Sequence, residues 1–147
     1  MSGHEQNHQS YVVTEQVGHL MRKAYQRHLA IFQENAVDPN LTSVQFVTLC
    51  VLRDNGPSSQ SELVKATDID QATIRGIIDR LKARKLISVD RDANDGRKVI
   101  MTLRPEGNAL IDEMRMSALK ITELTVKNLN SAERVAFNYL LKKVIEE

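Results

Sequence analysis

A predicted β-hairpin at residues 89–103, which read VDRDANDGRKVIMTL, constrains the fold of this chain more than any other segment. Two short apolar runs at 86–89 and 99–103 are typical of strands, and Asn94-Asp95-Gly96 lies between them. An Asp-Gly pair between such runs favours a tight turn, because glycine accepts the positive φ angle that the turn requires. The turn itself needs no charge, yet three basic residues surround it: Arg91, Arg97 and Lys98.

The segment before the hairpin predicts an amphipathic helix, with Asp70 placed to cap its first turn. Apolar side chains at i, i+3, i+4 and i+7 form one face: Ile74, Ile77, Ile78 and Leu81. The opposite face carries small residues and charges: Ala72, Arg75, Gly76, Asp79, Arg80 and Ala83. An exposed glycine costs a helix about 1 kcal/mol relative to alanine. Small residues beside arginines suit close approach to a ligand surface, whereas the alternative is simply a weak helix.

Positive charge is concentrated in this same region. The chain has a net charge of +1 at pH 7, which by itself argues against nucleic-acid binding. Residues 70–104, however, contain nine Lys or Arg and five Asp, so this segment carries +4 and the rest of the chain −3. A clustered basic excess is the electrostatic footprint of a protein that binds a phosphate backbone. A solvated surface with a chance excess of basic residues is the alternative.

The rest of the chain predicts five further helices, so the expected fold class is mainly α, with six helices and a small β-hairpin. Pro39 ends the first helix, and Thr42 with Gln45 forms a capping-box pattern for an apolar second helix. The five segments are expected to run from Ser10 to Glu34, from Thr42 to Asn55, from Ser59 or Ser61 to Thr67, from Pro105 to about Asn128 and from Ser131 to the C-terminus.

Length and composition place this chain among ordinary globular proteins. Its 147 residues fit one domain, 1–147, and 41% of them are hydrophobic. The sequence contains no apolar run long enough for a membrane span and no signal-peptide pattern at its start, so we expect no membrane partner and a cytoplasmic location. The single cysteine, Cys50, excludes an intramolecular disulfide and a multi-cysteine zinc site. We expect no cofactor.

Two short helices followed by a basic hairpin form a winged helix-turn-helix. With long helices on both sides, the chain from about Tyr11 to Glu147 resembles the MarR family of bacterial transcriptional regulators. The matching motifs are Asp79-Arg80-Leu81, Leu86-Ile87, Asp95-Gly96-Arg97 and Leu103-Arg104-Pro105-Glu106-Gly107. The family usually has glycine at the position of Lys85, arginine at that of Gly96 and threonine at that of Arg104.

The resemblance implies that residues 42–104 form the DNA-binding lobe. A recognition helix addresses base edges near its N-terminus, which favours Gln71, Thr73, Arg75 and Gly76 for the major groove. Arg80 is expected to bridge to phosphate or to an acidic residue of the wing. The resemblance places Arg97 in the minor groove, with Asp95 orienting the wing and Lys98 beside it. Ser59 and Ser61 are candidate phosphate contacts, although helix capping explains both serines equally well.

The long helices at 10–36 and 105–147 are implied to form a homodimer that binds a palindromic operator. The best candidates for the interface lie near the C-terminus: Val135, Leu140, Leu141, Val144 and Ile145. A monomeric core is the competing explanation for these apolar residues.

Many members of the family bind small phenolic or aromatic acids in a cleft between the dimer helices and the DNA-binding lobe. The first helix carries a polar stripe at spacings of three and four: Tyr11, Glu15, His19, Arg22 and Gln26. Arg22 is suited to a carboxylate and His19 to a ring substituent, so Tyr11, His19, Arg22 and Gln26 are our predicted effector ligands. A solvated helix face is the alternative.

The sequence therefore predicts a dimeric, sequence-specific DNA-binding repressor that an aromatic acid or phenol releases from its operator. A winged-helix protein-interaction module and a redox-responsive regulator are the alternatives. Cys50 lies in an apolar run with little to activate a thiolate, so a core role is expected. His4 and His8 have metal-ligand spacing without a third ligand. No catalytic motif is recognisable, and we expect no enzymatic activity.

Overall fold

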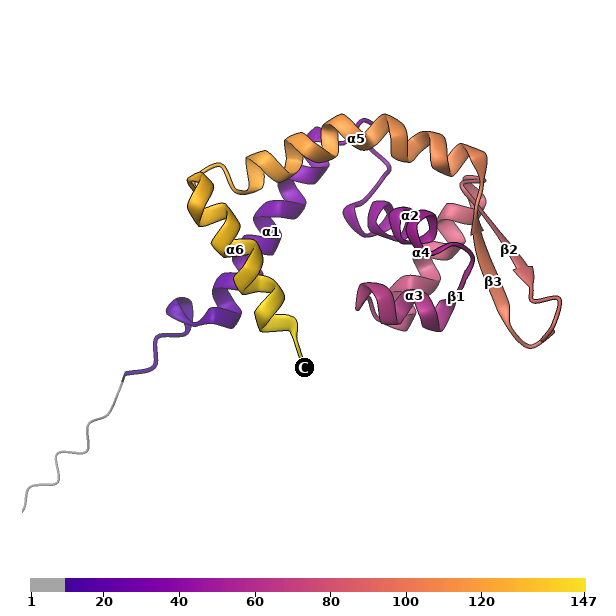
Figure 1. The fold of residues 1–147 in the computed structure, drawn as a ribbon, viewed down its shortest axis with the longest axis horizontal. Helices are drawn as coiled ribbons and strands as arrows, with labels where there is room; N and C mark the ends of the chain where they lie inside the picture. Colours follow the sequence, from indigo (N-terminus) through magenta and orange to yellow (C-terminus); the bar gives the residue numbers. More distant parts are fainter. Residues whose placement is uncertain (1–9) are drawn as a thin grey trace, which may run out of the picture.

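The computed structural model describes residues 10–147, which form six α-helices, one short 3₁₀ helix and three strands. The helical end consists of the 3₁₀ helix Val13–Glu15, α1 (Val17–Asn35), α5 (Pro105–Thr125) and α6 (Ser131–Ile145). The lobe consists of α2 (Ser43–Asn55), β1 (Ser58–Ser59), α3 (Gln60–Thr67), α4 (Gln71–Ala83), β2 (Ile87–Arg91) and β3 (Val99–Leu103). Figure 1 shows α5 running from the lobe across to α6 and α1.

Side-chain caps begin four of the helices. The Thr42 hydroxyl accepts from the Gln45 N–H at 3.2 Å, and the Gln45 side chain accepts from the Thr42 N–H at 3.2 Å, which confirms the predicted capping box. Asp70 caps α4 as predicted, and of the two candidates for the cap of α3, Ser59 and Ser61, it is Ser59 that forms it. The last helix begins at Ser131 as expected, but its cap is Asn130. Each cap satisfies backbone donors that would otherwise lack a partner.

The predicted start of the first helix at Ser10 is wrong. A short 3₁₀ helix occupies Val13–Glu15, and α1 begins only at Val17 because Gln16 has an extended backbone. The Gln16 side chain instead donates to the Val12 carbonyl oxygen at 3.0 Å. Apolar periodicity through this segment does not distinguish a continuous helix from two helical pieces joined by one extended residue.

The sheet has three antiparallel strands in the order β1-β3-β2, one strand more than the sequence predicts. Ile87 pairs with Leu103 and Arg91 pairs with Val99, so the hairpin register brackets the predicted turn. The added strand, β1, pairs Ser58 with Met101 and joins the start of α3 to the wing. A two-residue strand has no periodicity that sequence analysis can detect.

The hairpin is fixed to the helices on both sides of it. Lys85 has a φ of 60°, a left-handed conformation that ends α4 and turns the chain into β2. After the hairpin, the Arg104 N–H donates to the Leu86 carbonyl oxygen at 3.0 Å. Gly107, in the first turn of α5, packs directly on that same carbonyl.

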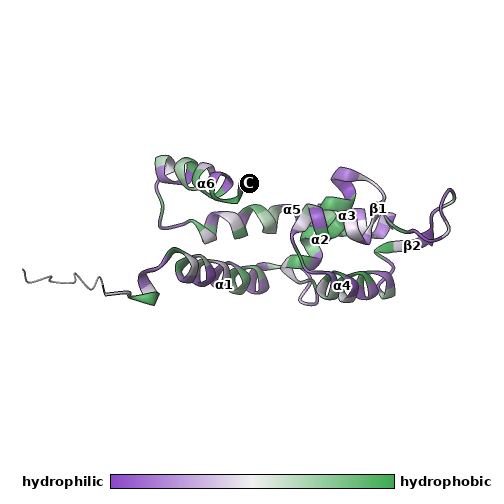
Figure 2. Ribbon diagram, turned by 90° about the horizontal axis from the view of Figure 1, so that it is seen from below, coloured by the Kyte–Doolittle hydropathy of each residue, from purple (hydrophilic) through white to green (hydrophobic). Residues whose placement is uncertain are grey.

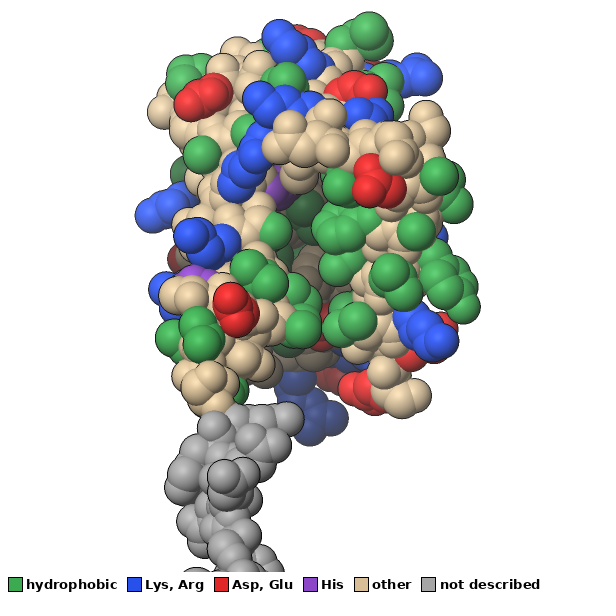
Figure 3. Space-filling model, turned by 90° about the vertical axis from the view of Figure 1, so that its left-hand side faces the viewer, with side chains coloured by type: hydrophobic (Ala, Val, Ile, Leu, Met, Phe, Trp, Pro, Cys, Tyr) green, Lys and Arg blue, Asp and Glu red, His purple; other side chains and the backbone are tan. Residues whose placement is uncertain are grey.

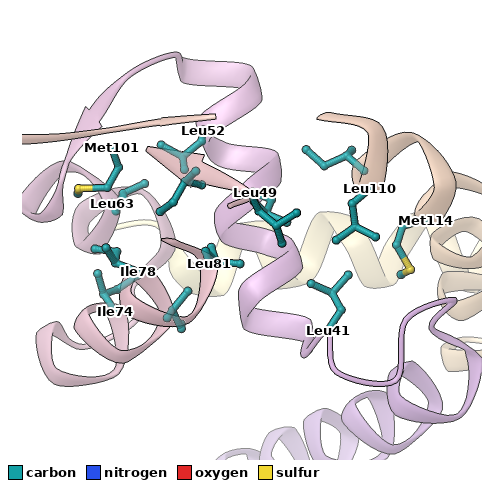
Figure 4. Packing of buried hydrophobic residues seen from close by; sticks show 14 of the residues in the cluster. Leu41, Leu49, Leu52, Leu63, Ile74, Ile78, Leu81, Met101, Leu110 and Met114 are labelled. Atoms are coloured by element: carbon teal, nitrogen blue, oxygen red, sulfur yellow. The ribbon is translucent and has the colours of Figure 1, made fainter. Parts of the chain in front are cut away.

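The hydrophobic core lies inside the lobe and extends under α5 (Figure 4). All four residues of the predicted apolar face of α4 are buried, and they belong to one cluster with Leu49 and Leu52 of α2. Farther along, Leu41 packs near Leu110 and Met114 of α5, and Phe32 of α1 belongs to the same cluster. The core therefore connects the lobe to the first part of the helical end.

The helical end is packed differently. Within the described chain, α6 has no buried residue, and its interface candidates Val135, Leu140, Leu141, Val144 and Ile145 are all exposed. A monomeric core does not explain these side chains. Figure 2 shows that α1 and α6 both carry hydrophobic residues along their length, on either side of α5 in that view.

Candidate nucleic-acid interface

The exposed face of α4 presents the predicted recognition residues together. Gln71, Thr73, Arg75, Gly76 and Arg80 all lie on this face, and each is exposed. A Cβ added at Gly76 would have no atom within 4 Å, so the middle of the face is open. Polar side chains around an open, small-residue position allow a helix to lie against a surface as broad as a DNA groove.

Thr73 is partly occupied by the cap of its own helix. Its N–H donates to Asp70 Oδ1 at 2.9 Å and its hydroxyl donates to Asp70 Oδ2 at 2.8 Å. These two hydrogen bonds hold the pKa of the Asp70 carboxyl below its usual value of 3.8. Thr73 therefore presents a hydroxyl oxygen and a methyl group, whereas Gln71 and Arg75 keep their donors for a ligand.

The turn between α3 and α4 gives the motif its shape. Asp68, the residue after α3, has a φ of 54°, and its N–H donates to the Val64 carbonyl oxygen at 2.8 Å. Asparagine and aspartate tolerate this left-handed conformation better than most residues. Thr67 supports the turn by accepting from the Ile69 N–H at 3.2 Å. This is the tight connection of a helix-turn-helix.

The two serines at the start of α3 have different surroundings. Ser59 is 6% exposed, and its hydroxyl contacts the Ser61 hydroxyl at 3.1 Å and accepts from the Glu62 N–H at 3.3 Å. Its burial favours the capping explanation for Ser59. Ser61 is exposed beside it, and its hydroxyl is hydrogen-bonded to that of Ser59 because Ser59 donates its own hydrogen to Glu62 Oε1 at 3.2 Å.

The wing tip is an ordered turn built by Asp95. Asp95 Oδ1 accepts from the Arg97 N–H at 3.1 Å and from Arg97 Nε at 3.5 Å, and the Asp95 carbonyl oxygen accepts from the Lys98 N–H at 2.9 Å. Arg91 donates to the Gly96 carbonyl oxygen at 3.2 Å and supports the turn from the β2 side. The Arg97 side chain is 95% exposed, so the turn fixes its backbone and leaves the guanidinium in solvent.

Two arginines near the end of α4 have separate environments. Arg84 forms an ion pair with Asp38, which ties the end of α4 to the segment between α1 and α2. Arg80 lines a cavity of about 260 Å³ between α4 and the start of α2, together with Thr42, Gln45 and Gly76. Among the described residues, no ion pair joins Arg80 to an acidic residue of the wing.

The predicted effector stripe lies along a largely exposed face of the first helical segment. Tyr11, Arg22 and Gln26 are exposed and His19 is half-buried, and none of the four lines a described cavity. On α1, residues 19, 22 and 26 point away from the face that carries Leu20, Ala24 and His28, because each residue advances about 100° around the helix. Their role in effector binding stays a prediction.

A different cavity, of about 220 Å³, lies between α2 and α5, and sequence reasoning missed it. Its lining combines aromatic, aliphatic and cationic side chains: Phe46, Cys50, Arg53, Ile111, Arg115, Ala118, Leu119 and Thr122. We call this the α2–α5 pocket. Arg53 binds Asp112 at 3.0 Å, whereas no ion pair among the described residues includes Arg115. Burial raises the pKa of the Cys50 thiol, Arg53 lowers it and Asp54 raises it, so the net shift favours the thiol.

A third, larger cavity of about 490 Å³ opens between α1 and α6, and we call it the α1–α6 groove. Figure 3 shows the molecule hollowed at this end, with hydrophobic side chains on both walls. Its lining is Val17, Leu20, Met21, Ala24, Tyr25, His28, Thr125, Phe137 and Leu141. No charged residue is among them.

None of the helices in residues 10–147 is both long and apolar enough to cross a membrane. Within the same residues, no group of three or more His, Cys, Asp or Glu side chains is placed to hold a metal ion. His4 and His8 lie outside the residues that the structure describes.

Comparison with known proteins identifies the relatives of this chain. A model of the MarR family matches residues 41–99. The HTH-type transcriptional repressor NicR of Pseudomonas putida is 63% identical over 136 residues, which cover 92% of this chain and 86% of NicR. The structure of Bordetella bronchiseptica BpsR, whose DNA binding is regulated by 6-hydroxynicotinic acid, is 56% identical, with a TM-score of 0.88 and coverage of 94% of this chain and 99% of BpsR. A mutant of MarR from Escherichia coli complexed with operator DNA is 26% identical, with a TM-score of 0.83 and coverage of 93% and 100%.

The fold and the exposed basic face define a winged helix-turn-helix DNA-binding regulator of transcription. The overall fold of the chain recurs in both solved structures, which cover 94% and 93% of its length. The chain belongs to the MarR family.

Proposed function

We propose that this chain is a dimeric repressor that binds a palindromic operator and is released by a hydroxylated aromatic carboxylic acid. The observation that carries the proposal is the exposed α4 face, with Gln71, Arg75 and Gly76, beside a wing whose Arg97 is 95% exposed. The 63% identity to NicR, a transcriptional repressor, supports repression. A repressor of this kind acts on DNA in the cytoplasm.

The pairing of two copies is supported by the helical end. The α1–α6 groove and the exposed apolar residues of α6 lie at the same end of the chain, away from α4 and the wing. A two-fold pair covers both surfaces at once, because each copy supplies a groove and an apolar helix to the other. The pair also presents two α4 helices to two half-sites of an operator.

Each predicted DNA contact has a distinct task in the proposed complex. Gln71 and Arg75 donate to adenine and guanine edges in the major groove, Gly76 lets α4 approach closely, and Thr73 contributes its methyl group and hydroxyl oxygen. Arg97 enters the minor groove, where a narrow A·T-rich sequence concentrates negative potential. Ser61, Arg80 and Lys98 contact phosphates.

The α2–α5 pocket is the effector site in this proposal. An aromatic carboxylic acid requires an apolar surface for its ring and a cation for its carboxylate, and the pocket provides Phe46 and Arg115. The regulation of BpsR by 6-hydroxynicotinic acid supports an effector of this class for a chain 56% identical to it. The pocket lies between α2 of the lobe and α5. A bound effector would therefore affect the position of the lobe relative to α5.

Selection of genomic fragments that the purified chain retains, followed by footprinting, tests this function. We expect a two-fold symmetric site next to genes for the metabolism of an aromatic acid, and release of that site by 6-hydroxynicotinic acid. Sequence-independent retention alone would contradict the repressor and favour a winged-helix interaction module. Release by peroxide, abolished by Cys50→Ser, would favour redox regulation over the acid.

A further inference from the structure

A hydrogen-bonded pair in the α1–α6 groove fixes the tautomer of His28. The Thr125 hydroxyl donates its one hydrogen to the Ile121 carbonyl oxygen at 2.8 Å. The oxygen of that hydroxyl lies 3.0 Å from His28 Nδ1, so it is Nδ1–H that donates to Thr125. The neutral imidazole therefore keeps its free lone pair on Nε2.

The surroundings of His28 disfavour a positive charge. His28 is half-buried and lines the groove, and burial lowers the pKa of its imidazole below 6.5. Tyr25 of α1, whose ring centroid lies 6.2 Å from that of His28, is the other titratable side chain in the lining. On the facing helices, α5 contributes Thr125 and α6 contributes two apolar side chains. The charged residues Glu123 and Arg134 bind each other at 2.7 Å and do not line the groove.

A second copy of this chain is the occupant that the groove fits. The groove is apolar on both walls, and the exposed side chains of α6 are apolar on more than one face: Val135, Tyr139, Leu140, Val144 and Ile145. Successive helical residues are rotated by about 100°, so Val135 and Tyr139 point away from the groove-lining Phe137 and Leu141. Each copy thus has both the α1–α6 groove and exposed apolar side chains on α6. This is the self-complementary arrangement that two-fold pairing requires.

We propose that His28 makes the pairing of two copies depend on pH, with the dimer favoured while the imidazole is neutral and weakened when it is protonated. This inference rests on the proposed function, because it requires that two copies pair through the α1–α6 groove. In the dimer, the partner covers an imidazole whose protonated form would hold a charge and a new N–H donor in an apolar interface.

The direction of the pH effect follows from this burial. Covering the groove lowers the pKa of His28 further. At a pH below the pKa that His28 has in the separate chain, each copy must therefore lose a proton in order to pair. Dimer affinity is therefore complete above the pKa of His28 in the separate chain, which is lowered from 6.5, and falls as pH decreases until the pKa of His28 in the dimer is reached. Two symmetric copies contribute, so the dissociation constant rises by up to about 100-fold per pH unit within this window.

Sedimentation equilibrium of the full chain between pH 7.5 and pH 5, without effector or DNA, tests the proposal. The wild-type dissociation constant is expected to increase at least about tenfold over this range. His28→Asn keeps a side-chain N–H for Thr125 but does not titrate, and His28→Gln is a second neutral replacement. Both are expected to remain dimeric and to show less than about a threefold change. His19→Asn, which removes the histidine on the opposite face of α1, is the matched control and is expected to keep the wild-type pH dependence.

The outcomes separate this inference from the proposed function. A wild-type chain that is monomeric at every pH would overturn the proposed dimer, and the pH device with it. A dimer whose affinity does not change with pH, or whose pH dependence persists in His28→Asn and His28→Gln, would leave the dimer intact and overturn the role of His28. Loss of the pH dependence in both variants, but not in His19→Asn, would support it.

Discussion

Gly107 packs so closely on the backbone carbonyl of Leu86 that a Cβ at residue 107 would overlap that carbonyl oxygen and the Leu103 side chain. The same oxygen accepts from the Arg104 N–H at 3.0 Å, so the end of β3 and the first turn of α5 meet at one point of the chain. The wing and α5 meet at this point with no room for a side chain. This explains why glycine stands at residue 107, the last position of the family-like motif.

We expect Gly107→Ala to destabilise the protein. Replacing a helical glycine with alanine ordinarily gains about 1 kcal/mol, but forcing a methyl group against backbone costs about 1–3 kcal/mol, and here the carbonyl cannot move without the hairpin. Chemical denaturation at one fixed chain concentration measures the change. Gly18→Ala is the control, because a Cβ at residue 18 meets no atom within 4 Å and should be neutral or stabilising. Equal stability of the two variants would contradict the steric argument.

Arg97→Ala should weaken operator binding and its salt dependence. Loss of a minor-groove arginine is expected to cost roughly 1–3 kcal/mol per wing and to reduce the slope of log K against log salt by about 1 for each wing. Fluorescence anisotropy over a salt series measures both quantities. Lys120→Ala, which removes an exposed positive charge from α5, controls for net charge. An Arg97→Ala slope equal to that of the control would exclude the wing from the interface.

Asp70 should make stability depend on pH at the acidic end. Its pKa is lowered in the folded chain by the hydrogen bonds from the Thr73 N–H and hydroxyl, so its contribution is present above 3.8 and is lost as pH falls through the lowered value. Asp70→Asn keeps an acceptor for the cap but does not titrate. We expect the stability advantage of the wild type over Asp70→Asn to shrink between about pH 5 and about pH 3. A constant difference over that range would show that the cap does not depend on the charge.

Arg115 and Arg22 distinguish two positions for the effector site. The quantity to measure is the ratio of operator affinity without and with 6-hydroxynicotinic acid, for Arg115→Met and for Arg22→Met. Loss of a carboxylate-binding arginine is expected to reduce effector binding by roughly 1.5–3 kcal/mol, or about 10- to 100-fold. The α2–α5 pocket predicts this loss in Arg115→Met, whereas the polar stripe of α1 predicts it in Arg22→Met. If only Arg22→Met loses the response, the pocket assignment is wrong.

The local features of the lobe could be predicted from the sequence because each depends on nearby residues. The caps at Thr42 and Asp70 require only a hydroxyl or carboxylate and an N–H three residues later. The wing requires Asp-Gly between two strand-like runs, and capping residues with apolar periodicity predict the order of the helices around it. The roles of the individual DNA contacts remain predictions.

The features that sequence analysis missed arise from tertiary contacts. β1 is two residues long and exists only because Ser58 meets Met101. The α2–α5 pocket joins Phe46 to Arg115, which are far apart in the sequence and have no shared periodicity. The break before α1 depends on the extended backbone of Gln16, in a segment whose apolar spacing favours an uninterrupted helix.

The uninterrupted α5 gives the molecule a mechanical property. Its 21 residues reach from Pro105, at the base of the wing, to Thr125, beside the groove, a length of about 30 Å. In the proposed dimer, each α5 is a stiff lever with one end at the two-fold contact and the other at the DNA-binding lobe. A tilt of roughly 5° at the contact would displace the wing by roughly 2–3 Å over that length. The half-site spacing that the dimer can bind would therefore depend on the tilt of α5 at the two-fold contact, far from the DNA bases.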